Sequence, residues 1–171
     1  MSTSTGADEL RRLQQPLKRR YQSEADAALV TLAADGDLDE GLTCTVQTGQ
    51  ALVRAGLHPG TGGDGTSACS GDMLLQALVA CAGVTMRAVA TSMGISVGGS
   101  VHAEGDLDWR GTLAVDRETP IGFSEIRLRF DLESDAGDEE LATLERLTER
   151  YCVVFQTLAQ SPTLSVSRKR L

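Results

Sequence analysis

The chain has 171 residues, which is enough for one domain that buries about two-thirds of its surface. Its net charge of −8 argues against nucleic acid as a partner, because phosphate binding needs basic patches. The sequence shows no N-terminal apolar signal and no run of about 18 apolar residues, so we expect a cytoplasmic protein with no membrane partner.

The N-terminal third predicts a tail and the first strands. Residues 1–27 are polar and predict a flexible or partly helical segment, followed by a single domain over 28–171. Residues 28–38 predict a strand that runs into a turn at Asp35-Gly36-Asp37. Alternation over 41–49 predicts a half-buried strand with Cys44 on its inward face. Residues 50–57 fit a strand or a short amphipathic piece, and the Gly-rich residues 58–71 predict a mobile connector.

A long helix should follow this connector. Leu74, Leu78, Ala82 and Val89 fall at helical spacing, and Gly94 stands where a helix would end. Asp72 stands near the predicted start, where aspartate is a favoured N-cap. Because apolar and small residues surround the axis on nearly every side, we expect a buried central helix.

The remaining segments predict strands around a second helix. Strands are expected over 95–108, 112–116 and 122–133, and the last of these has one core face and one solvated face. Asp138 begins the second helix, and residues 163–168 predict a closing strand. The order of elements predicts an α+β domain.

The four cysteines, at positions 44, 69, 81 and 152, contain no C-x-x-C pair, which argues against a structural zinc site. A peroxide-reducing pair needs one thiol with a lowered pKa and a second thiol to resolve the sulfenic acid. Cys81 lies about 13 Å into its helix, too deep for strong help from that helix's own dipole. Free cysteines often simply pack in a core, so inert thiols remain an alternative.

Two segments resemble the signatures of the OsmC and organic hydroperoxide resistance proteins. The first is GDMLLQALVACAGVTMRAVA, with an acid (Asp72) nine residues before Cys81 and with Thr85-Met86-Arg87 after it. The second is the run from Tyr151-Cys152 to Leu158. The resemblance covers roughly 38–168.

This resemblance implies an OsmC-like fold, with antiparallel sheets packed around a central and a second helix in an intertwined homodimer. It implies reduction of organic hydroperoxides or hydrogen peroxide, with Cys81 as the peroxidatic thiol, Cys152 as the resolving thiol and Asp72 as an orienting acid. A dithiol such as a dihydrolipoyl group would regenerate the enzyme, and no cofactor or metal is implied.

Three departures from the family pattern keep other functions open. Asp72 replaces the usual Glu, Val153 replaces the usual proline, and no Arg occupies residues 27–51. Arg54, Arg87 and Arg20 are the candidates for that missing Arg, and His58 for a donor or base. The alternatives are a non-catalytic small-molecule binder or thiol redox sensor on the same fold, and a structural dimer with inert cysteines.

Overall fold

The computed structural model describes residues 8, 12, 14, 15, 23, 36–38, 43–47, 52–114 and 116–170, with the backbone alone for 36–38, 43–47 and residue 52. The described positions within 1–27 have helical backbone. Most of the predicted tail and the predicted strand over 28–35 lie outside the described residues, as does the inward orientation of the Cys44 side chain.

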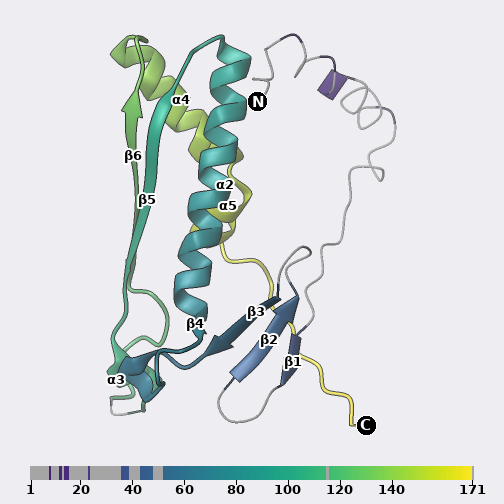
Figure 1. Cartoon of the computed structure of the whole chain (residues 1–171), viewed down its shortest axis with the longest axis vertical. Helices are drawn as coiled ribbons and strands as arrows, with labels where there is room; N and C mark the ends of the chain where they lie inside the picture. Colours follow the sequence, from purple (N-terminus) through teal and green to yellow (C-terminus); the bar gives the residue numbers. More distant parts are fainter. Residues whose placement is uncertain are drawn as a thin grey trace.

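A four-stranded sheet precedes the long helix (Figure 1). Strands β1 (Gly36–Leu38), β2 (Thr43–Gln47) and β3 (Leu52–Gly56) pair antiparallel, and β4 (Ala68–Cys69) pairs parallel to β3. The predicted turn at 35–37 is wrong, because Gly36 and Asp37 pair with Val46 and Thr45. The predicted strand over 41–49 is confirmed as β2, and residues 52–56 form a strand. The connector contains a short 3-10 turn, η2 (Pro59–Thr61).

The long helix α2 (Ser70–Met93) ends at Gly94, as predicted, where a φ of 74° favours glycine. It begins two residues before Asp72, so Cys69 is its N-cap and Asp72 lies in its first turn. Its buried residues are Leu78, Ala82, Met86, Val89 and Ala90. The expected burial on nearly every side is wrong for one chain, because Val84 is 73% exposed.

By length and composition alone α2 is long and apolar enough to cross a membrane, although the sequence analysis expected no such segment. Central helices of soluble proteins meet the same two criteria.

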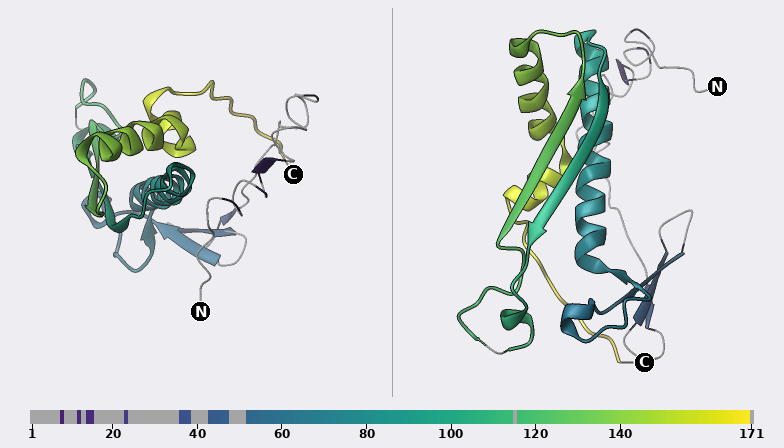
Figure 2. Two further views of the ribbon diagram at one scale, coloured as in Figure 1. Left: turned by 90° about the horizontal axis from the view of Figure 1, so that it is seen from above. Right: turned by 60° about the vertical axis from the view of Figure 1, so that its left-hand side comes forward.

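Strands β5 (Gly98–Asp106) and β6 (Glu125–Glu133) form a long antiparallel ribbon in which Val101 faces Phe130. The ribbon lies beside α2 and the second helix (Figure 2). Its apolar residues pack into the core against these helices, whereas its charged residues alternate with them at exposed positions. The predicted strand over 112–116 is wrong, because Trp109–Thr112 form a short helix, α3. The Asp108 side chain caps α3 by accepting a hydrogen bond from the Arg110 N–H.

The second helix is interrupted at a cysteine. α4 (Asp138–Tyr151) begins as predicted, and the Glu140 carboxylate accepts a hydrogen bond from the Gly137 N–H at its start. At Cys152 the backbone is extended, with φ −74° and ψ 108°, and α5 (Val153–Ala159) follows. Residues 163–168 pair with no strand in the described part of the chain, so the predicted closing strand does not form within one copy.

The core has two clusters along α2. The upper cluster joins α2 to Leu144 of α4, with Phe130 and Leu132 of β6 packed against it. The lower cluster consists of Leu78, Ala82 and Cys152. Cys81 packs against this lower cluster, so both candidate thiols, Cys81 and Cys152, lie there.

Candidate functional site

Cys81 and Cys152 lie together in the lower core cluster, although 71 residues separate them in the sequence. Both thiols are free. Cys81 is half-buried, whereas Cys152 has no exposed surface. Part of Cys81 is therefore open to solvent, whereas Cys152 is enclosed by the protein.

The break at Cys152 determines what surrounds Cys81. Because the chain leaves α4 there and starts α5, the first backbone N–H groups of α5 have no carbonyl partner within their own helix. The N–H groups of Val153 and Val154 face the Cys81 sulfur. The Thr85 hydroxyl and the Cys152 thiol also approach this sulfur.

These donors change the ionisation of Cys81. Partial burial opposes its ionisation, but the N–H of Val154, the Cys152 thiol, the N–H of Val153 and the Thr85 hydroxyl together outweigh burial and lower the pKa of the Cys81 thiol. Two of these four groups are side chains and two are backbone N–H groups.

Cys152 behaves in the opposite way. Burial raises the pKa of the Cys152 thiol, and its contact with Cys81 raises it further, although the Phe155 N–H acts against this rise. The proton shared between the two sulfurs therefore stays on Cys152, and Cys81 is the thiol that ionises. A partly exposed thiol with a lowered pKa beside a second thiol has the two groups that peroxide reduction followed by disulfide closure requires.

A mostly apolar cavity lies against the core cluster that holds the thiol pair, although neither cysteine lines it. It has a volume of about 320 Å³ and lies between α2, β6 and α5. Leu78, Ile126, Leu128 and Phe155 line it, and the same four side chains belong to the cluster around the two cysteines.

The structure does not bring Asp72 to Cys81 within one chain. The nine residues between them place the two side chains on opposite sides of α2 and about 13.5 Å apart along its axis. Asp72 instead lines a second cavity, of about 340 Å³, together with His58, Cys69 and Trp109. The His58 ring stacks on Trp109 at 4.9 Å and accepts a hydrogen bond from the Gly60 N–H, so His58 belongs to this second cavity.

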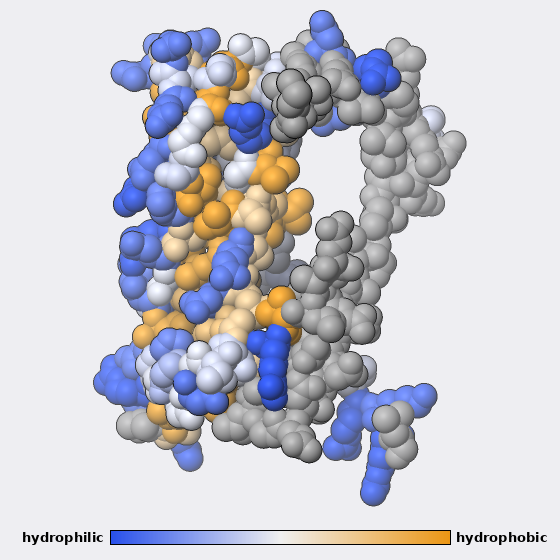
Figure 3. All heavy atoms as spheres, in the orientation of Figure 1, coloured by the Kyte–Doolittle hydropathy of each residue, from blue (hydrophilic) through white to orange (hydrophobic). Residues whose placement is uncertain are grey.

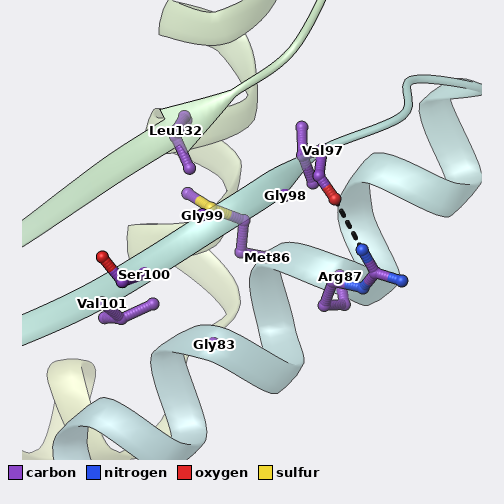
Figure 4. Close-up of a pocket in the computed structure, with 9 residues that line it drawn as sticks. All are labelled: Gly83, Met86, Arg87, Val97, Gly98, Gly99, Ser100, Val101 and Leu132. Carbon is purple, nitrogen blue, oxygen red and sulfur yellow. Dashed lines mark hydrogen bonds between the residues drawn. The ribbon is translucent and has the colours of Figure 1, made fainter.

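Arg87 also lies away from Cys81. Its guanidinium donates to the Val97 carbonyl at 2.6 Å, beside a cavity on the β5 side of α2 (Figure 4). Arg54 lies on β3 and acts electrostatically on Asp64, and Arg20 lies outside the described residues. The donors identified at Cys81 are therefore uncharged. Among the described residues, no group of three or more His, Cys, Asp or Glu side chains could hold a metal ion.

The remaining candidates are spread over the molecule. His102 lies on the outer face of the ribbon, where its Nε2 contacts both Asp131 and Ser100. Because both contacts use the same ring nitrogen, these three residues do not form a relay of the Ser-His-Asp type. The sequence did not predict that the N–H groups of Val153 and Val154 lower the pKa of Cys81. Every residue except proline has a backbone N–H group, so residue type does not identify the donors. Thr85 could have been found from its position one turn after Cys81.

The OsmC-like protein family model matches residues 62–167, which is more than half of the chain. The chain belongs to the OsmC-like family. The matched region contains α2 and both thiols. No curated protein matches.

Solved structures of OsmC-like proteins share this fold at low sequence identity. An OsmC-like protein from Mycoplasma pneumoniae is 17% identical with a TM-score of 0.66, covering 77% of this chain and 89% of its own. A Vibrio cholerae OsmC-like protein of unknown function is 12% identical with a TM-score of 0.61, covering 75% and 94%. An organic hydroperoxide resistance protein OsmC from Legionella pneumophila is 19% identical with a TM-score of 0.57, covering 77% and 90%. These likenesses establish the fold, while the chemistry has to be argued from the residues of this chain.

Proposed function

We propose that this OsmC-like protein is a thiol-dependent peroxidase that uses Cys81 as its nucleophile and Cys152 as its resolving thiol. The observation that carries the proposal is the contact between a half-buried Cys81 with a lowered pKa and a sealed Cys152 with a raised pKa. The lowered pKa favours the thiolate of Cys81, which is the species that attacks a peroxide.

The reaction has three steps. The Cys81 thiolate attacks the outer oxygen of the hydroperoxide, the O–O bond breaks, and the departing alkoxide takes a proton and leaves as the alcohol. Cys152 then gives up its proton and attacks the sulfur of the Cys81 sulfenic acid, so that the S–S bond forms, the S–O bond breaks and the hydroxyl leaves with that proton as water. An external dithiol, with dihydrolipoyl groups as the leading candidate, reduces the disulfide by thiol exchange and is itself oxidised.

The cavity beside the thiols favours organic hydroperoxides over hydrogen peroxide. Its volume of about 320 Å³ falls at the lower end of the range for small-molecule sites, and its lining is mostly apolar. A hydrocarbon substituent would gain from leaving water there, whereas hydrogen peroxide has no such group.

We also propose that the protein works as a homodimer. An apolar face of α2 is uncovered in the single chain, and apolar atoms gather over this helix (Figure 3). Leu74, Ala77, Ala80 and Val84 make up this face, here called the α2 patch, and Cys81 lies at its edge. A second copy packed on the patch would remove it from water and bring a subunit boundary to the thiol site.

The thiols and the charge of the chain suit a particular cellular environment. Free cysteines suit the reducing cytoplasm, and the acidic chain does not suit nucleic acid. Any direct part that Asp72 plays in the reaction requires a second copy of the chain, because within one copy it faces away from Cys81.

A thiol redox sensor is the second candidate. It is favoured by the uncharged set of donors at Cys81, since the hydroperoxide-resistance branch of the family resembled by this sequence uses an Arg there. A sensor would be oxidised once and would not turn over with a dithiol present.

Steady-state consumption of cumene hydroperoxide with dihydrolipoamide tests the proposal. The wild-type protein should turn over many times, Cys81→Ser should fall to the background rate, and Cys69→Ser should keep its activity as the matched control. Oxidation of wild-type protein without turnover would support the sensor, and full activity in Cys81→Ser would refute the assignment of the nucleophile.

A further inference from the structure

The cavity on the β5 side of α2 combines apolar walls with one positively charged side chain (Figure 4). Its volume is about 240 Å³. The guanidinium of Arg87 lies at one end of it, against the Val97 carbonyl. Hydrocarbon side chains supply the apolar part of the lining: Met86, Val97, Val101 and Leu132. Neither Cys81 nor Cys152 lines the cavity, so it is separate from the thiol site.

Glycines keep this cavity open. Gly83 of α2 and Gly98 and Gly99 of β5 line it and contribute no side chains. A Cβ on Gly83 would already contact the Val101 side chain at 3.6 Å, so a larger side chain there would occupy the space between the helix and the strand. The room for a ligand therefore follows from the residues that line the two elements.

Arg87 is held in place, but most of its donors are unused. One terminal N–H of its guanidinium donates to the Val97 carbonyl at 2.6 Å, which fixes the group at the end of the cavity. A guanidinium carries five N–H donors. Among the described residues, no ion pair and no further hydrogen bond uses the others, whereas the guanidinium of Arg127 is paired with Asp106. The cavity therefore offers a positioned positive charge that no carboxylate of the described chain neutralises.

We propose that this cavity binds a small organic monoanion, namely a carboxylate that carries a short hydrocarbon chain. The carboxylate accepts from the free N–H groups of Arg87, whose planar fork matches two oxygens. The hydrocarbon chain leaves water against Met86 and Val101. Glu133 lies beside Gly98 and would repel a second negative charge, so a monoanion fits better than a dianion. The volume is below that of most drug-sized sites, which selects a small ligand.

A titration with hexanoate tests the proposal, followed by NMR on protein labelled with carbon-13 at its methionine methyl groups. The Met86 signal should shift, because Met86 lines the cavity. The Met73 signal should not shift, because Met73 lies about 20 Å away along α2. Acetate lacks the hydrocarbon chain and 1-hexanol lacks the charge, so each should bind at least about tenfold more weakly than hexanoate.

A pair of variants isolates the charge. Arg87→Met removes the guanidinium and should weaken hexanoate binding at least about tenfold. Arg146→Met makes the same change of charge at an exposed position of α4 that does not line the cavity, and should stay within about twofold of wild type. Far-UV circular dichroism checks that each variant is folded. If Arg87→Met does not fold, the comparison of hexanoate with 1-hexanol in the wild-type protein decides the role of the charge.

Three results would overturn the proposal. The first is an unresponsive Met86 signal, which is also the result expected if a carboxylate of a second copy already fills the cavity. The second is an equal shift at Met73 and Met86, and the third is equal hexanoate affinity in Arg87→Met and Arg146→Met or equal affinity of wild type for hexanoate and 1-hexanol. Because no thiol lines the cavity, binding of hexanoate is independent of whether the protein reduces peroxides.

Discussion

Asp72 and Cys81 belong to the same helix, yet they lie on opposite sides of it and about 13.5 Å apart along its axis. The motif that places an acid before the cysteine therefore does not by itself place that acid at the thiol. In this chain Asp72 stands in the first turn of α2, where a carboxylate interacts favourably with the helix dipole.

Asp72→Asn tests that reading. We expect it to lower the free energy of unfolding by about 0.3–1 kcal/mol through the lost interaction with the dipole, measured by urea denaturation. The alkylation rate of Cys81 should stay within about twofold of wild type, since the two groups do not meet in one chain. A change of about tenfold in that rate in either direction would show that a second copy brings Asp72 to the thiol.

The two thiols should separate by their pH dependence. The pKa of Cys81 is lowered, so its thiolate persists to lower pH than that of an ordinary cysteine, and its reactivity is lost only as the pH falls through the lowered value. The pKa of Cys152 is raised, so Cys152 gains reactivity only as the pH rises above the ordinary cysteine range.

Site-resolved alkylation of native protein at neutral pH should therefore modify Cys81 well before Cys152. Unfolding the protein in urea should make the two rates similar. Faster modification of Cys152 in the native protein would contradict the assigned roles.

The α2 patch makes a prediction about assembly. Val84→Asp places a charge in the middle of the proposed interface, where burial without a partner is costly, so the dimer should dissociate. Sedimentation velocity should show monomers for this variant and dimers for wild type. Glu145→Ala, on an exposed position of α4, is the control and should remain dimeric. If the Val84→Asp protein stays dimeric, the α2 patch is not the dimer interface.

The ribbon depends on one glycine. Gly99 has a φ of 109°, and a Cβ there would lie 1.9 Å from the Asp131 carbonyl oxygen. Gly99→Ala should therefore destabilise the fold by about 1–3 kcal/mol or more, measured by urea denaturation. Gly122→Ala meets no atom within 4 Å and should have little effect. Equal stability of the two variants would show that the ribbon can shift to accept the side chain.

The sequence predicted the structure best where a hydrophobic pattern extends over many residues. The apolar spacing along α2 predicts this helix, and the glycine at position 94 predicts where it ends. The spacing of the two cysteine motifs predicts the family. The alternation along β6 likewise predicts which of its faces is buried, because a strand's side chains point to opposite sides in turn.

Other features required the folded chain. No proline marks the break at Cys152 in the sequence. The break leaves the first N–H groups of α5 without a partner in their own helix, and these groups face Cys81. The helix α3 is too short for a periodic signal and forms because Asp108 caps it. The exposure of Val84 was invisible because one chain's sequence cannot show whether an apolar face meets its own core or another copy.

The central claim is that peroxide oxidises Cys81 and that Cys152 then resolves it. The most direct measurement is peptide mapping after one equivalent of cumene hydroperoxide. The account predicts a Cys81–Cys152 disulfide within single wild-type chains, and a dimedone adduct on Cys81 when Cys152→Ser is treated in the same way. A dimedone adduct on Cys69 in place of Cys81, or wild-type protein that retains both thiols after this treatment, would contradict it.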